Sequence, residues 1–197
     1  SLAAFGNHHF MGNITGNHDR ARFISYADGS VRFDEDAKAA GWTREITIQD
    51  STALDKMALL MAFNFSVPGV PVIYYGDEIG MCGGNDPDNR RMMRFENLTK
   101  RETELKKTVE QLAKMRHSNM ALLYGNTKVL KAEGDVLVIE RAYFDEKVVL
   151  VLNNSSQPKK VTANGSEKLT ANFGSEKDGN IITLGAYKFD ILTNGTL

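Results

Sequence analysis

The chain has 197 residues, 42% of them hydrophobic and 25% charged, which is ample for a packed core and excludes a disordered or low-complexity chain. Lys and Arg number 24 against 25 Asp and Glu, so the sequence carries no basic footprint for nucleic acid or an anionic membrane. No apolar run approaches the roughly 18 residues of a membrane-spanning helix, and the single cysteine, Cys82, can form neither an internal disulfide nor a cysteine metal cluster.

The first 119 residues alternate between apolar runs and helical patterns. A short apolar run over 11–16 ends in polar residues, and Asp50-Ser51 then gives a cap signal for a helix. The helical pattern stops at Pro68-Gly69, and a β-branched and aromatic run follows over 70–75. That run is apolar on both faces, which is typical of a buried parallel strand. The apolar stripe of the predicted helix consists of Leu54, Met57, Ala58, Met61 and Phe65.

A loop rich in Gly, Asn and Asp follows over 76–89. Thr99 with Glu102 forms a capping-box pattern that opens a second helix. The order strand, long loop, helix then occurs twice, which predicts two consecutive βα units of a parallel α/β fold. The buried side of the second helix is predicted at Leu105, Val109, Leu112 and Met115.

From residue 120 the apolar pattern changes to a period of two with short turns, which predicts antiparallel strands. We therefore expect an α/β domain over 1–119 and an all-β sandwich over 120–197, a size that just sustains its own core. The strands are predicted over 127–131, 136–143 and 148–153, with turns at 133–135, 145–147 and 153–156, and further strands around Val161, Leu169, 181–184 and 187–192.

Polar residues stand where the first strand ends, in the order Asn17-His18-Asp19. In a (β/α)8 barrel the catalytic groups lie at the carboxyl ends of the strands, so this cluster is well placed for catalysis. His18 can donate hydrogen bonds to hydroxyls, and Asp19 can accept two or stabilise a developing cation. The ordinary alternative is a turn or helix cap after a strand, where Asn and Asp are favoured.

The second strand runs into a loop over 76–91 that carries four carboxylates and two arginines. Together the two segments, at their separation along the chain, resemble the α-amylase superfamily of glycoside hydrolases. The second loop is most similar to neopullulanase and cyclomaltodextrinase-type members. The resemblance covers essentially the whole chain. It implies the last two βα units of a (β/α)8 TIM barrel, strands seven and eight with their helices, followed by a C-terminal antiparallel β-sandwich.

The resemblance also implies roles for individual residues. His18 and Asp19 match the substrate-binding histidine and the third catalytic carboxylate, and Asn17 belongs to the same substrate-binding motif. Asp86 and Arg90 match a pair that hydrogen-bonds the next sugar toward the non-reducing end. The alternative for Asp86 and Arg90 is that they pair only with each other and hold the loop.

Three other polar residues near these motifs are expected to be structural. Asp77 and Glu78 are expected to organise the strand-end loop through hydrogen bonds, and Arg22 to form a structural pair. The spacing of Asp86 and Asp88 matches the first ligands of an EF-hand calcium loop. The later positions of that loop need an oxygen ligand, Gly and Glu, whereas this sequence has Arg, Arg and Asn there. Members of the resembled family often hold calcium, usually through residues upstream of this region, so we assign no metal site and no cofactor.

A retaining glycosidase needs two carboxyl groups flanking the scissile bond. In the resembled family the nucleophilic Asp and the acid Glu both precede the Asn-His-Asp motif, whereas the sixteen residues before Asn17 contain neither Asp nor Glu. We therefore expect this chain to be the C-terminal portion of a larger enzyme and to be inactive alone. Open barrel edges would then favour self-association.

Two functions from different classes follow from the resemblance. The first is an α-glucan hydrolase that cleaves α-1,4 bonds of maltodextrin, pullulan or cyclodextrin, with α-1,6 cleavage left open. The second is a non-catalytic barrel relative that serves as a glucan-binding or partner subunit. The intact Asn-His-Asp motif favours the enzyme, because a binding-only relative has no need of a transition-state carboxylate. Hydrolysis and transglycosylation are not separated by the sequence.

Overall fold

The computed structural model describes residues 11–194, so the parts of the predicted domains over 1–10 and 195–197 lie outside the described residues. Contacts within the described chain form two compact units, one of residues 13–58 and 71–110, the other of residues 11–12, 59–70 and 111–194. None of the helices in the described part is long and apolar enough to cross a membrane. Helices and 3₁₀ turns are α2 (Phe23–Asp28), α3 (Ala37–Thr43), α4 (Thr52–Ser66), η1 (Asp77–Ile79), η2 (Asp88–Arg90), α5 (Lys100–Ser118) and α6 (Met120–Tyr124).

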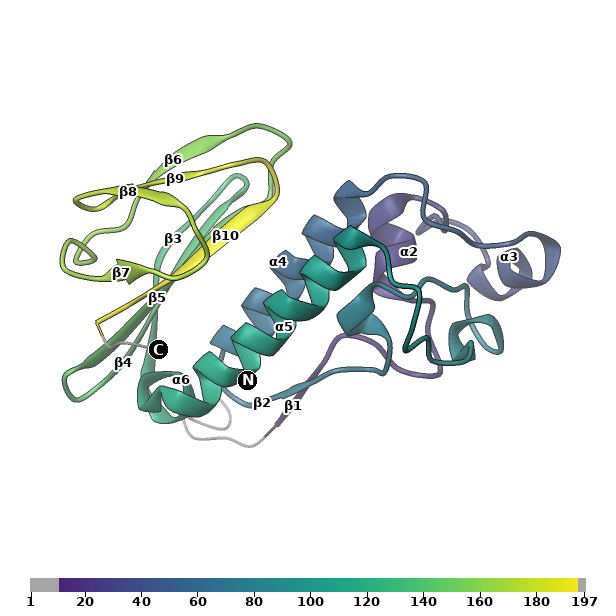
Figure 1. Cartoon of the computed structure of the whole chain (residues 1–197), viewed down its shortest axis with the longest axis horizontal. Helices are drawn as coiled ribbons and strands as arrows, with labels where there is room; N and C mark the ends of the chain where they lie inside the picture. Colours follow the sequence, from purple (N-terminus) through teal and green to yellow (C-terminus); the bar gives the residue numbers. More distant parts are fainter. Residues whose placement is uncertain (1–10, 195–197) are drawn as a thin grey trace. The chain divides into compact units, whose positions relative to one another are not determined.

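Two short strands, β1 (Gly12–Ile14) and β2 (Val70–Val72), pair in a sheet of their own and run in the same direction (Figure 1). Both are shorter than the predicted runs 11–16 and 70–75, and a turn follows each strand. The Asn17 Oδ1 atom accepts a hydrogen bond from the Asp19 N–H at 2.8 Å. After β2, the Asp77 N–H donates to the Tyr74 carbonyl at 3.0 Å.

Helix α4 begins where the cap signal predicts. The Asp50 carboxylate accepts hydrogen bonds from the Thr52 N–H at 2.9 Å and from the Thr52 hydroxyl at 2.6 Å. This satisfies donors that the first helical turn leaves unpaired. The predicted stripe is confirmed as buried except for Ala58, which is half-buried.

Helix α5 confirms the predicted capping box. The Thr99 N–H donates to Glu102 Oε2 at 2.7 Å, and the Glu102 N–H donates back to Thr99 Oγ1 at 3.3 Å. The reciprocal pair satisfies two backbone donors at the helix start. The predicted inner face is buried at all four positions, Leu105, Val109, Leu112 and Met115.

Thr99→Ala is expected to lower the free energy of unfolding by about 1 kcal/mol, because it removes the side-chain acceptor of the cap. The matched control is Thr108→Ala in the same helix. The Thr108 hydroxyl donates back to the Glu104 carbonyl at 3.0 Å, and Ala has the higher helix propensity there. For the control, the free energy of unfolding measured in urea should therefore stay within about 0.5 kcal/mol of the wild-type value. Equal losses in both variants would contradict the capping assignment.

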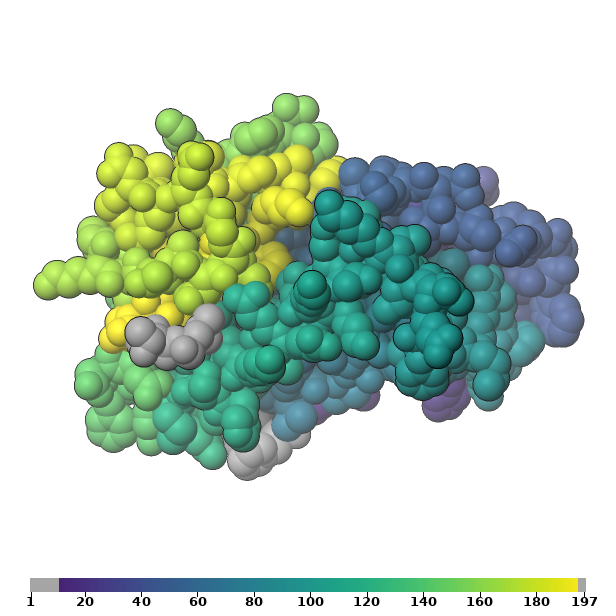
Figure 2. Space-filling view, in the orientation of Figure 1, coloured from purple at the N-terminus to yellow at the C-terminus, as the bar shows by residue number. Residues whose placement is uncertain are grey.

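The C-terminal residues form two antiparallel sheets, in the orders β3-β4-β5-β10-β7 and β6-β9-β8. Buried residues from both sheets share one core, which includes Val138, Val151, Ile182 and Leu192. In the space-filling view, the green and yellow segments form one closely packed body (Figure 2). The strands are β3 (Asn126–Glu133), β4 (Val136–Tyr143), β5 (Glu146–Asn153), β6 (Lys159–Thr162), β7 (Thr170–Ala171), β8 (Glu176–Asp178), β9 (Ile181–Leu184) and β10 (Lys188–Thr193).

The turn predicted at 145–147 is wrong by its last two residues. Phe144 and Asp145 make the turn, and β4 and β5 pair over their whole length from Tyr143 opposite Glu146 onward. The charged residues that suggested a longer turn are accommodated on the strand, because Lys147 Nζ lies 2.6 Å from Glu140 Oε2 on the neighbouring strand. Phe144 takes a φ of 50° at this turn.

Two buried arginines hold the end of α4 within the same unit as the C-terminal sheets. Arg116 Nη1 donates to the carbonyls of Phe65 at 2.6 Å and Val67 at 2.9 Å. Arg141 Nη1, from β4, donates to the Ser66 carbonyl at 2.7 Å. Cations at these carbonyls also complement the negative end of the helix dipole. Burial, together with the nearby charge of Arg116, lowers the pKa of Arg141 to about 10.

Candidate functional site

The segments that follow β1 and β2 are joined by a buried asparagine. The Asn89 side-chain amide donates to the Arg20 carbonyl at 2.7 Å and to the Asn17 carbonyl at 3.3 Å. Asn89 is fully buried. It was not predicted from the sequence, because an Asn in an Asn-rich loop gives no signal of the residues it will contact. The bond fixes the Asn-His-Asp turn against the loop after β2.

Four of the predicted site residues form a chain of polar contacts on the surface. His18 Nε2 lies 3.3 Å from Asp19 Oδ2, and Arg90 Nη2 lies 4.0 Å from Asp19 Oδ1. Arg90 Nε in turn lies 2.9 Å from Asp86 Oδ1. The Asp19 side chain is 71% exposed and that of His18 61%, so both are open to a ligand. Asn17, the fifth residue, holds the turn through its bond to the Asp19 N–H.

The pairing of Asp86 with Arg90 is the contact that the structural alternative predicts. Both side chains are nevertheless partly exposed, 39% for Asp86 and 46% for Arg90. Partly exposed ion pairs contribute little to stability, with a median of about 0–1 kcal/mol. The pair can therefore exchange contacts with sugar hydroxyls at low cost, so holding the loop and binding a ligand are compatible roles.

A buried ion pair supports this exposed cluster. Arg22 Nη1 lies 3.0 Å from Asp77 Oδ1, and both side chains are 1% exposed. The same guanidinium donates to the carbonyls of Tyr75 at 2.5 Å and Asn89 at 3.0 Å, and lies 4.2 Å from the Tyr74 ring centroid. The predicted structural pairing of Arg22 and the predicted loop-organising role of Asp77 are confirmed.

Two features complete the packing beneath the motif. A Cβ on Gly16 would lie 2.8 Å from Asp77 Oδ2, so the glycine before Asn17 leaves room for the buried carboxylate. Glu78 was also expected to organise the loop by hydrogen bonds. Its Oε2 atom is buried and finds no partner among the residues described, so the role is found for Asp77 and not for Glu78.

Burial raises the pKa of Asp77 from 3.8 to about 6, although Arg22 lowers it. The unfolded carboxyl group loses its proton at a lower pH than the folded one. The folded state therefore binds more protons in this window, and the free energy of unfolding contributed by Asp77 falls as the pH rises from about 4 to about 6.

Asp77→Asn is expected to remove this fall, which amounts to about 3 kcal/mol. Urea unfolding across the window, compared with the wild type, measures the difference in slope. Asp34→Asn serves as the control: Asp34 is an exposed carboxylate paired with Arg32, and Arg32 lowers its pKa. An Asp77→Asn variant that kept the wild-type slope would contradict the assignment.

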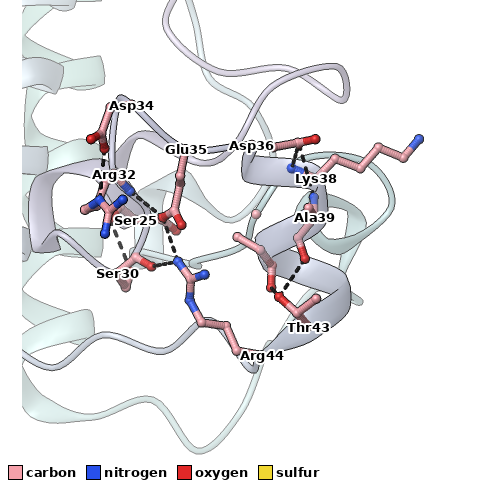
Figure 3. A network of polar contacts seen from close by, with 12 residues as sticks. Ser25, Ser30, Arg32, Asp34, Glu35, Asp36, Lys38, Ala39, Thr43 and Arg44 are labelled. Carbon is pink, nitrogen blue, oxygen red and sulfur yellow. Dashed lines mark hydrogen bonds and ion pairs between the residues drawn. The ribbon is translucent and has the colours of Figure 1, made fainter.

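A polar network around α3 was not predicted from the sequence (Figure 3). Glu35 Oε1 accepts from the Arg32 N–H and from Arg44 Nη2, both at 2.6 Å. Asp36 caps α3 by accepting from the Lys38 and Ala39 N–H groups. An Asp before an Ala-rich stretch is a cap signal that would have located this helix. The network holds the connection between α2 and α3.

Within residues 11–194, no group of three or more His, Cys, Asp or Glu side chains is arranged to hold a metal ion. Cys82 lies beside Arg91, which also pairs with Asp88. Burial raises the pKa of the Cys82 thiol. Asp88 thus has a structural partner of its own and does not join the Asp19 cluster.

Comparison with known proteins bears on these residues. The family model of the alpha amylase catalytic domain matches residues 2–122. A cyclomaltodextrinase of Thermoanaerobacter pseudethanolicus is 32% identical over 88% of this chain and 27% of its own length. A cyclomaltodextrin glucanotransferase of Bacillus sp. (strain 1011) is 35% identical over 66% of this chain and 19% of its own length. The chain thus spans about a quarter or less of these relatives.

Solved structures agree with the sequence relatives. The alpha-amylase of Geobacillus thermoleovorans, crystallised with acarbose, superimposes with a TM-score of 0.69 and 25% identity. The match covers 93% of this chain and 38% of that protein. The neighbouring folds are therefore derived from a TIM barrel and carry a C-terminal sheet domain.

Proposed function

The chain belongs to the α-amylase catalytic-domain family of glycoside hydrolases, and from this premise we propose that it is the C-terminal portion of a retaining α-glucan hydrolase. The proposed substrates are maltodextrin, pullulan and cyclodextrin, cleaved at α-1,4 bonds. The observation that carries the proposal is the contact of Asp19 with His18 and Arg90 where the segments after β1 and β2 meet.

In the proposed reaction, the residues of this chain bind sugar hydroxyls and stabilise charge. The Asp19 carboxylate accepts hydrogen bonds from two hydroxyls of the sugar whose bond is cleaved, and His18 donates one. As the anomeric carbon becomes positive in the oxocarbenium-like transition state, the negative charge of Asp19 stabilises it. Asn17 binds substrate and holds the turn, and Asp86 and Arg90 bind the next sugar. In this proposal, other residues of the enzyme supply the nucleophile and the general acid.

The proposed domain organisation follows the resemblance. Residues 1–119 are assigned to the seventh and eighth strands of the barrel with their helices, and residues 120–197 to a C-terminal β-sandwich. The pairing of β1 with β2 and the shared core of the two antiparallel sheets support this assignment. We assign no cofactor to these residues.

The proposal is tested with the full-length gene product by a reducing-sugar assay on maltohexaose and pullulan. We expect hydrolysis of maltohexaose. The identity of the trisaccharide released from pullulan decides the bond cleaved there, because α-1,6 cleavage gives maltotriose and α-1,4 cleavage gives a product that keeps an α-1,6 bond. If the full-length protein binds maltohexaose without cleaving it, the proposed hydrolase activity is overturned in favour of the non-catalytic alternative.

The 197-residue chain alone is proposed to be inactive and to self-associate. Ile14 on β1 is 59% exposed and Val70 on β2 45%, and exposed apolar strands favour association. The same assay on the purified chain should show no turnover, and light scattering should show a species larger than the monomer. Turnover by the chain alone would overturn the proposed division of catalytic groups.

A further inference from the structure

The turn between β4 and β5 presents an aromatic ring in an unusual setting. Phe144 is 90% exposed and has a φ of 50°. For a residue other than Gly, Asn or Asp, this left-handed conformation carries a steric cost. Because the Phe144 ring stays in water, hydrophobic burial does not offset that cost. The neighbouring β3–β4 turn has Gly134 with a φ of 55°, which takes the same conformation freely. The two-residue hairpin turn sets the positive φ at this position, and glycine is the residue that meets it without steric cost.

Phe144 belongs to an aromatic depression in the unit that holds the C-terminal sheets. The Phe144 and Tyr143 rings are 4.7 Å apart at 89°, and the Tyr143 and Tyr124 rings are 6.0 Å apart at 46°. The three rings are therefore inclined to one another. They line an open depression of about 230 Å³ together with Asn126 and Ala142, which we name the aromatic depression.

The chemistry of the aromatic depression points to a neutral, partly apolar ligand. No charged side chain lines it, so nothing there selects for an anion or a cation. The side chains of Tyr124 and Tyr143 add hydroxyl groups to this lining. Flat rings with polar edges suit a ligand that is apolar on its face and polar around its rim. A pyranose ring has this character.

We propose that the aromatic depression is a second glucan-binding site, in which a glucosyl unit stacks on Phe144 and donates or accepts hydrogen bonds at the rims of Tyr124 and Tyr143. The choice of glucan as the sugar rests on the proposed function. Pockets that enclose a drug-sized ligand span about 300–1,000 Å³. The smaller, open depression therefore fits one sugar unit of a longer chain, and it shares no residue with the Asp19 cluster.

The test is a calorimetric titration of maltohexaose into the 197-residue chain and its variants. Phe144→Asn should weaken binding by about tenfold, because it removes the stacking face. Asn tolerates the left-handed turn, so the thermal midpoint should stay level or rise, which separates lost binding from unfolding. Phe95→Asn, at an 81% exposed ring outside the aromatic depression, should bind as the wild type does.

Asp19→Asn in the same titration separates the two sites, since it should leave the Phe144-dependent binding in place. Phe144→Asn with wild-type affinity would overturn the inference. Dissociation of a self-associated chain by Phe144→Asn, without any loss of sugar binding, would overturn it in favour of a protein contact. Phe144-dependent binding together with no hydrolysis by the full-length protein would leave this inference standing and remove the proposed enzyme.

Discussion

Asp19→Asn in the full-length protein is expected to lower kcat for maltohexaose hydrolysis by about 100- to 1,000-fold, the loss typical of one preorganised group that stabilises transition-state charge. The substitution keeps the size of the side chain and its turn, because Asn17 holds the Asp19 N–H and not its carboxylate. It removes the negative charge that is proposed to stabilise the developing cation. Initial rates over a range of maltohexaose concentrations separate kcat from KM.

The matched control is Asp34→Asn. Asp34 is 77% exposed against 71% for Asp19, and it also pairs with an arginine at the surface. Its removal should leave kcat and KM within twofold of the wild type, since it lies in the α2–α3 connection and not in the Asp19 cluster. A small effect of Asp19→Asn confined to KM would assign Asp19 to ground-state binding and contradict the catalytic role.

Arg22→Met is expected to lower the free energy of unfolding by about 3–5 kcal/mol, the range for breaking one side of a buried ion pair. The variant leaves Asp77 buried without its cation and removes donors from the Tyr75 and Asn89 carbonyls. Met keeps much of the side-chain volume, so the loss reports on charge and hydrogen bonding more than on a cavity.

Arg32→Met is the control for this loss, because Arg32 forms an ion pair of similar length with Asp34 at the surface. The distances are 2.9 Å for Arg32 with Asp34 and 3.0 Å for Arg22 with Asp77, while the arginine side chains are 68% and 1% exposed. The free energy of unfolding of the control, measured in urea, should differ from that of the wild type by at most about 1 kcal/mol. Equal losses would show that burial does not set the strength of the Arg22 pair.

Local sequence signals predicted the elements of the fold well. Two helix caps, the capping box of Thr99 and Glu102 and the cap at Asp50, depend only on residues within one helical turn. They can therefore be predicted from the sequence alone. The strands β4 and β9 fall where the apolar period of two places them. Strand ends were less predictable. β2 ends at Val72 although the apolar run continues to Tyr75, and the turn closed by the Asp77 N–H and the Tyr74 carbonyl follows.

The candidate site also contains both residues that the sequence predicted and contacts that it did not. The Asn-His-Asp motif and the residues Asp86 and Arg90 were found by their resemblance to a family, and their roles remain predictions. Arg22 was predicted to pair, but its partners lie more than 50 residues away along the chain. Long-range contacts of this kind depend on how the loops fold over each other. The bridge made by Asn89 could not be predicted for the same reason.

The buried arginines at the end of α4 bear on how this protein can be divided for expression. A gene cut between residues 119 and 120 would separate Arg141 from the Ser66 carbonyl and leave the carbonyls of Phe65 and Val67 with Arg116 on the other piece. The sheet piece would then keep the bonds of Arg141 to the Gly125 carbonyl but lose its acceptor on Ser66. A soluble sheet module therefore needs the segments 59–70 and 111–119 as well, and fusion partners are better joined outside them.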